Sequence, residues 1–119
     1  RNIYTDVQTV IDRYKPDAIA VEELFFNNNV KTAINVAQAR GALLAAASMK
    51  TSELYEYTPL QIKQAIVGYG RADKHQIQQM VMYFLNLDKI PKPDDAADGL
   101  AAAICHAHTA KMGSQFKIK

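Results

Sequence analysis

Two short motifs, one early and one late in the chain, carry carboxylates suited to hold a metal ion. Glu22 follows the apolar run Ala18–Val21, and Asp95 and Asp98 lie three residues apart, in the first turn of a predicted helix. A fold that brings the end of the early strand to the start of the late helix gathers all three carboxylates in one pocket. Carboxylate oxygens bind hard cations such as Mg²⁺, which stabilise the attacking and leaving oxygens of phosphoryl transfer. The motifs therefore predict a Mg²⁺ site with Glu22, Asp95 and Asp98 as catalytic residues and metal ligands.

Each of these carboxylates also has a purely structural explanation. Glu22 is compatible with a solvated strand end. Asp95 and Asp98 share one face of a helix, and acids in a first helical turn complement the helix macrodipole. Only the combination of the three residues favours a metal site.

Cations and aromatic residues accompany these motifs. Lys63, Arg71 and Lys74 flank the turn Gly68–Gly70, where flexible backbone and positive charge suit contact with phosphates. A solvated turn in which Gly68 ends a helix explains the same pattern. Phe25 and Phe26 suit stacking on an unpaired base, although adjacent aromatic residues are more often part of a core.

The histidines and the cysteine give weaker signals. His106 and His108 are two residues apart, so they diverge on a helix and do not suit joint ligation of one metal ion. His106 remains a candidate accessory residue that faces the carboxylates. Cys105 is interpreted as a packed residue, not a nucleophile.

Length and composition indicate one soluble domain in a reducing compartment. The chain has 119 residues, of which 49% are hydrophobic and 22% charged, with a net charge of +2. The single cysteine excludes an internal disulfide. No apolar run approaches the roughly 18 residues of a membrane span, and we expect no signal peptide.

The order of predicted elements is α-β-α-β-α-α-α, which indicates an α/β domain. Two strands are too few for a stable sheet, so we expect a fragment of a longer protein that lacks an N-terminal hairpin. Thr58 with Gln61, and Asp73 with Gln76, predict capping boxes at two helix starts. The predicted elements are a helix ending near Tyr14, a strand over 18–25, an Ala-rich helix over Thr32–Lys50, a strand over Leu54–Tyr57, helices over 59–67 and from 73 to about Leu87, and a last helix from Asp94 or Asp95 to about Lys111.

Several motifs in order make the chain similar to the RuvC family of bacterial Holliday-junction resolvases, within the RNase H-like nuclease superfamily. The resemblance extends over nearly the whole chain. It rests on the segments 16–25, 38–41, 61–70, 72–78 and 95–101, with Ile104 and His106.

The resemblance implies an RNase H-like α/β fold, here a fragment with about two parallel strands and five helices. Residues 1–119 would form a single resolvase domain, its C-terminal part. The family's first catalytic Asp lies on an opening strand of a three-stranded meander that has no counterpart here, so we expect the chain itself to be inactive. Glu22, Asp95 and Asp98 match the other three catalytic acids. Phe25 matches an aromatic near the junction centre, with Phe26 beside it in the sequence, while Lys63 and Lys74 match basic residues assigned to DNA binding and catalysis.

The implied function is a crossover junction endonuclease that cuts four-way DNA in recombination and repair, by two-metal phosphodiester hydrolysis. The implied cofactor is two Mg²⁺ ions, with Mn²⁺ as a substitute. The implied partners are junction DNA, a second copy through the helix Thr32–Lys50, and a branch-migration helicase complex, in the bacterial cytoplasm at the nucleoid. The alternative is a non-catalytic RNase H-like module for DNA binding or dimerisation.

Overall fold

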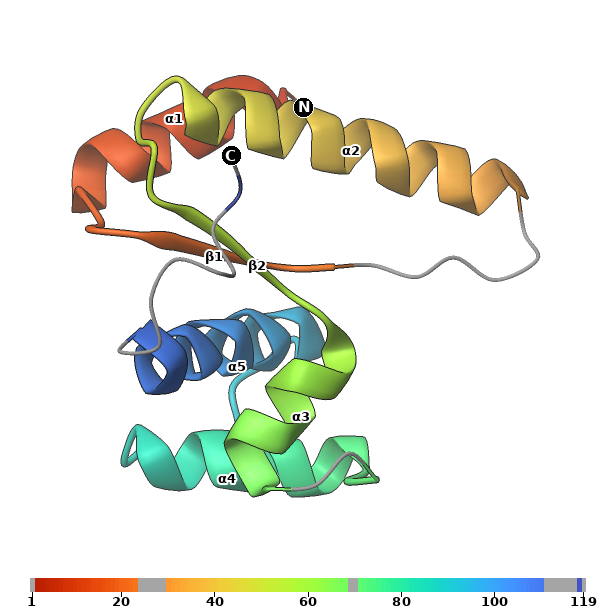
Figure 1. Cartoon of the computed structure of the whole chain (residues 1–119), viewed down its shortest axis with the longest axis vertical. Coiled ribbons are helices and arrows are strands. Elements are labelled where there is room, and N and C mark those ends of the chain that lie inside the picture. Colours follow the sequence, from red (N-terminus) through yellow and green to blue (C-terminus); the bar gives the residue numbers. More distant parts are fainter. Residues whose placement is uncertain (1, 24–29, 69–70, 111–117, 119) are drawn as a thin grey trace. The chain divides into compact units, whose positions relative to one another are not determined.

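A computed structural model describes residues 2–23, 30–68, 71–110 and 118, with only the backbone of 30–32. The order of elements confirms the predicted α/β class (Figure 1). The elements are α1 (Ile3–Tyr14), β1 (Ile19–Glu22), α2 (Val30–Ser48), β2 (Leu54–Tyr57), α3 (Pro59–Val67), α4 (Lys74–Phe84) and α5 (Asp94–Thr109).

The two strands pair with each other and run parallel. The amide of Ile19 donates to the carbonyl of Glu53 at 2.9 Å, and the amide of Glu23 donates to that of Tyr57 at 2.7 Å. Partner numbers that rise together along both strands are the mark of a parallel pair. The first strand was predicted to reach Phe25, but β1 ends at Glu22, and 24–29 lie outside the described residues. Glu22 is therefore the last residue of its strand.

The described residues fall into two compact units, and the first contains α1 and α2. The side chain of Asn2 accepts from the amide of Thr5 at the start of α1, and Lys15 ends this helix with a φ of 47°. The helices pack on each other, and Lys50 Nζ lies 2.9 Å from a carboxylate oxygen of Asp12. Within the described residues no helix is both long and apolar enough to cross a membrane.

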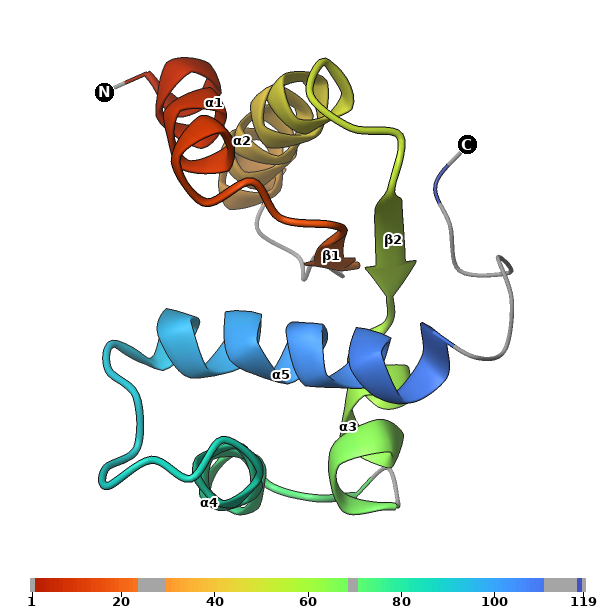
Figure 2. The ribbon, with the colours of Figure 1, turned by 90° about the vertical axis from the view of Figure 1, so that its left-hand side faces the viewer.

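The second unit holds Ala20–Glu23, the rest of β2, and α3, α4 and α5. The three helices pack against one another, and α5 passes between α4 and the strand residues of this unit (Figure 2). Their apolar faces form one core. Its buried members are Tyr57, Ile62, Ile66, Ala72, Ile77, Val81, Ala101, Ala102, Ile104 and Cys105.

Local capping sets where α3 and α4 begin. Both predicted capping boxes are present, with Thr58 and Gln61 at α3 and Asp73 and Gln76 at α4. Gly68 ends α3 with a φ of 84°, which glycine adopts without steric cost.

The bounds of α2, α4 and α5 differ from the predictions. The helix predicted to reach about Leu87 stops at Phe84, because Asn86 takes a left-handed conformation with a φ of 53°. The amide of Leu87 then donates to the carbonyl of Met82 at 2.9 Å, as in a Schellman motif. The Ala-rich helix begins and ends two residues earlier than predicted, at Val30 and Ser48, and α5 ends at Thr109 before the predicted Lys111.

Candidate active site

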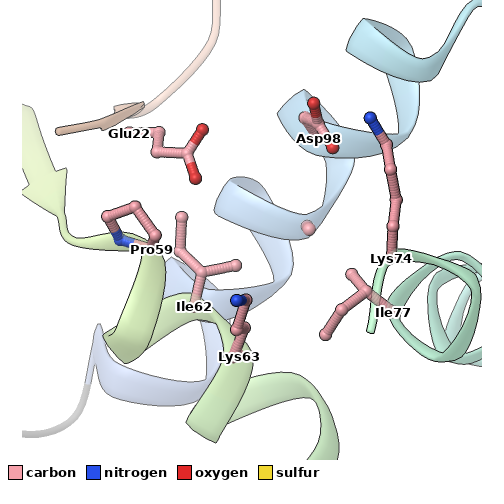
Figure 3. A pocket seen from close by; sticks show the side chains of 8 residues that line it. Glu22, Pro59, Ile62, Lys63, Lys74, Ile77 and Asp98 are labelled. Atoms are coloured by element: carbon pink, nitrogen blue, oxygen red, sulfur yellow. The ribbon is translucent and has the colours of Figure 1, made fainter. Parts of the chain in front are cut away.

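A half-open cavity of about 220 Å³ lies in the second unit, where the end of β1 meets three helices. Figure 3 shows Glu22 on the strand and Asp98 on α5, with the two lysines on α3 and α4. The lining residues are Glu22, Pro59, Ile62, Lys63, Lys74, Ile77, Asp98 and Ala101. The structure thus brings together four of the residues that the sequence proposed from separate motifs.

Each charged side chain reaches the cavity because of its place on its own element. Asp98 lies one turn into α5, flanked along the helix by Ala97 and Ala101, which are buried in the core. Lys63 lies on α3 one residue after the buried Ile62, and Lys74 is the first residue of α4. The capping boxes therefore determine where both lysines stand.

The electrostatics of the cavity are set by two carboxylates that face each other. Burial, and then the neighbouring charge of Asp98, raise the pKa of Glu22 above its ordinary value. Lys63 and Lys74 act in the opposite direction without reversing the shift. A bound cation would reduce the repulsion between these two carboxylates.

Lys74 also has a partner outside the cavity lining. Its Nζ lies 3.2 Å from a carboxylate oxygen of Asp94, and Gln78 Nε2 donates to the other oxygen at 3.3 Å. The hydrogen bond to Asp94, followed by the charge of Asp98, raises the pKa of Lys74. Lys74 therefore stays protonated at neutral pH and is held at the rim of the cavity.

Asp95 does not line this cavity. It is exposed at the start of α5, one turn before Asp98. Among the described residues, no group of three or more His, Cys, Asp or Glu side chains is arranged to hold a metal ion. The set of three carboxylates in one pocket thus stays a prediction, and the structure brings together two of them.

Four candidate residues remain, namely Phe25, Phe26, Arg71 and His106. Phe25 and Phe26 lie outside the described residues. Arg71 is exposed at the turn before α4 and does not line the cavity. His106 lies two turns after Asp98, away from the cavity lining, so its accessory role stays a prediction.

His106 instead belongs to a polar network that the sequence analysis did not find. Its Nδ1 lies 2.6 Å from the hydroxyl of Tyr57, to which Thr109 Oγ1 donates at 3.1 Å. The ring of Tyr55 lies 4.2 Å from that of His106, centroid to centroid. Tyr55 and Tyr57 belong to β2, whereas His106 and Thr109 belong to α5, far along the chain. The available sequence signal was the spacing of the two tyrosines, since residues two apart on a strand point to the same face.

The packed interpretation of Cys105 predicts an unreactive thiol. Cys105 is 0% exposed, and burial raises its pKa to about 11. We expect about one thiolate per thousand molecules at pH 8, and therefore very slow labelling of the folded chain by a disulfide reagent. Labelling should become rapid in concentrated urea. A cysteine introduced by Ala103→Cys, at an exposed position of the same helix, is the control that should react at once; equally fast labelling of native Cys105 would contradict the packing.

The parallel strands, the carboxylates and the helical layout define an α/β protein of the RNase H-like nuclease class. A family model described as "Crossover junction endodeoxyribonuclease RuvC" matches residues 1–106. The chain belongs to the RuvC family. It is 59% identical over 119 residues to the RuvC of Alkaliphilus oremlandii, covering 100% of this chain and 73% of the relative. It is 57% identical over 115 residues to that of Clostridioides difficile, covering 97% and 68%.

Solved structures give the same result for the fold. The chain superimposes on "T. thermophilus RuvC in complex with Holliday junction substrate" with a TM-score of 0.90 and 40% identity, covering 98% of this chain and 70% of that one. A second Thermus thermophilus RuvC structure gives a TM-score of 0.86 at the same identity and coverage.

Proposed function

We propose that this chain carries the catalytic pocket of a crossover junction endodeoxyribonuclease, which hydrolyses phosphodiester bonds in four-way DNA junctions. The observation that carries the proposal is the cavity in which Glu22 and Asp98 face each other beside Lys63 and Lys74. Membership of the RuvC family and the likeness to a junction-bound relative support the substrate. Recombination and repair are the processes in which such junctions arise.

The donor set of the cavity fits a divalent cation. Glu22 and Asp98 offer carboxylate oxygens, and the pKa of Glu22 is raised by burial and then by the charge of Asp98, a repulsion that a cation would offset. We assign Glu22 and Asp98 as ligands, with Asp95 as a third from the same helix, and Mg²⁺ as the ion, two per site, replaceable by Mn²⁺. Such ions activate a water molecule and stabilise the leaving oxygen. The protein's own part is to hold the two carboxylates in one cavity, where a cation would favour their ionised forms.

The lysines supply the positive charge that a DNA backbone needs. Lys63 and Lys74 border the two carboxylates, so they would hold the phosphates on either side of the scissile bond and offset charge that develops on its oxygens. Exposed Arg71 would extend this surface. Phe25 and Phe26 would stack on bases at the junction centre.

Lys63→Ala is expected to weaken junction binding mainly through the loss of one phosphate contact. The slope of log affinity against log salt concentration should fall in magnitude by about 1, and the loss should be the same for different junction sequences. Titration of a fluorescent junction at several salt concentrations measures both quantities. Lys89→Ala, at an exposed position outside the cavity, is the matched control. An unchanged slope for Lys63→Ala would show that Lys63 does not contact a DNA phosphate.

Symmetric cutting of a four-way junction requires two active sites, so the proposal includes a homodimer. The Ala-rich helix α2, with exposed Ile34, is the proposed contact between copies. A branch-migration helicase complex is the proposed partner, and the bacterial cytoplasm, at the nucleoid, is the proposed location.

Cleavage of a labelled mobile four-way junction in Mg²⁺ tests the function. The 119-residue chain is compared with a chimera that carries, before Arg1, the opening segment of the Alkaliphilus oremlandii relative. Paired symmetric nicks by the chimera would support a resolvase, and nicks by the chimera alone would place a required ligand in the added segment. Junction binding without cleavage by either protein would favour the non-catalytic module.

A further inference from the structure

Tyr57 connects more elements of the second unit than its place at the end of a short strand suggests. It is the last residue of β2, and only 1% of its surface is exposed. Its carbonyl accepts from the amide of Glu23 at 2.7 Å, directly after Glu22. The next residue, Thr58, caps the helix that carries Lys63. The backbone of Tyr57 is therefore tied to two elements that line the cavity.

The side chain of Tyr57 is tied to a third element, α5. Its hydroxyl lies 2.6 Å from His106 Nδ1 and accepts from Thr109 Oγ1 at 3.1 Å. Thr109 Oγ1 also lies 2.9 Å from the carbonyl of Cys105, which shares the single hydroxyl hydrogen of Thr109, so the Tyr57 hydroxyl is linked through Thr109 to the helix backbone. Tyr57 is buried while His106 and Thr109 are half-buried, and hydrogen bonds shared in such a network restrain its members.

We propose that Tyr57 is a positioning residue of the active site, whose hydroxyl sets the separation between Glu22 and Asp98 by fixing α5 to the strand end. Asp98 and His106 lie on the same helix, about 12 Å apart along its axis, so a shift at His106 moves Asp98 with it. Displacement of a reacting group by about 1 Å is enough to cost about a hundredfold in rate. The expected effect on the cleavage rate rests on the proposed function, whereas the effect of the Tyr57 hydroxyl on the separation of Glu22 and Asp98 does not.

Tyr57→Phe separates this role from simple packing, because it keeps the buried ring and removes only the hydroxyl. The first readout is the titration of Glu22, followed by carboxyl-carbon NMR on the metal-free 119-residue chain. Burial and the charge of Asp98 raise the pKa of Glu22, so a looser α5 weakens both causes. We expect the pKa of Glu22 in Tyr57→Phe to move down towards that of an ordinary glutamate.

Tyr83→Phe is the matched control, since it makes the same chemical change at a side chain that is 74% exposed on α4. It should leave the titration of Glu22 unchanged. An unchanged Glu22 titration in folded Tyr57→Phe would overturn the proposal.

A pair of variants at His106 tests the same link from the other side. Asn keeps a hydrogen-bonding group near the position of Nδ1, whereas Leu removes it. His106→Leu should lower the pKa of Glu22 and His106→Asn should restore part of the shift. If Tyr57→Phe does not fold, this pair decides the question, and the absence of any difference between its members would overturn the proposal.

Metal dependence supplies a second readout that a general loss of stability would not give. In a form of the chain that cleaves junctions, Tyr57→Phe should raise the Mg²⁺ concentration for half-maximal rate about tenfold, with little change in junction affinity. If no form cleaves, the proposed function fails, but the Glu22 titration still tests the positioning role.

Discussion

Replacing Glu22 by glutamine is expected to reduce junction cleavage by about 10³-fold or more while leaving junction affinity within about twofold. The amide keeps the size of the side chain but removes the negative charge that a divalent cation requires. Glu22 shares the cavity with Asp98, whereas phosphate contacts are assigned to the lysines. Single-turnover cleavage and binding in Ca²⁺ measure the two effects separately, in the form of the chain that cuts. Retained cleavage would exclude Glu22 as a ligand.

The stability of Glu22→Gln shows whether the lost activity reflects unfolding. The pKa of Glu22 is raised in the folded chain, so the folded state holds this proton more tightly than the unfolded state. The fold therefore loses stability as the pH rises from the ordinary pKa of a glutamate to the higher pKa of Glu22 in the folded chain. Glu22→Gln should melt at the same temperature as wild type or slightly higher at pH 7, and the gain should vanish in acid. A marked fall in melting temperature would mean that the inactive variant is misfolded.

Ile66→Ala is expected to destabilise the chain by about 3 kcal/mol. Ile66 is 3% exposed in the core shared by α3, α4 and α5, so truncation loses buried apolar surface and leaves a cavity. The corresponding fall in melting temperature is about 10 °C or more. Urea unfolding followed by circular dichroism measures the free-energy change.

Leu60→Ala is the matched control for the core prediction. Leu60 lies on the same helix but is 53% exposed, so its truncation should cost less than about 0.5 kcal/mol. A similar cost for both substitutions would show that the α3 face assigned to the core is wrong.

Sequence reasoning succeeded where the signal is local. The capping boxes at Thr58 and Asp73 depend on side chains only three residues apart, and both were predicted. The strand Leu54–Tyr57 was predicted without error. The meeting of Glu22 with Asp98 was predicted from the two motifs, whereas the role of Lys63 and Lys74 beside the carboxylates came from the family resemblance, because no local rule joins residues so far apart in the chain.

Contacts that depend on tertiary packing were not predicted. The hydrogen bond between Tyr57 and His106 joins residues 49 positions apart, and His106 was predicted instead as an accessory residue that faces the carboxylates. The ion pair between Lys74 and Asp94 depends on how α4 meets α5. The end of α4 at Phe84 was also not predicted, because the helical spacing of apolar residues continues to Leu85, beyond the last residue of the helix.

The buried face of α5 is made largely of alanine, and this restricts which side chains are tolerated next to the cavity. Ala97, Ala101 and Ala102 are 1–2% exposed, so the helix packs closely on its neighbours through methyl groups. A longer side chain at Ala101 would enter the cavity that Glu22 and Asp98 line and reduce its volume. A change on the buried face of α5 therefore requires a compensating change in the neighbouring core, and the two together alter the cavity that Glu22 and Asp98 line.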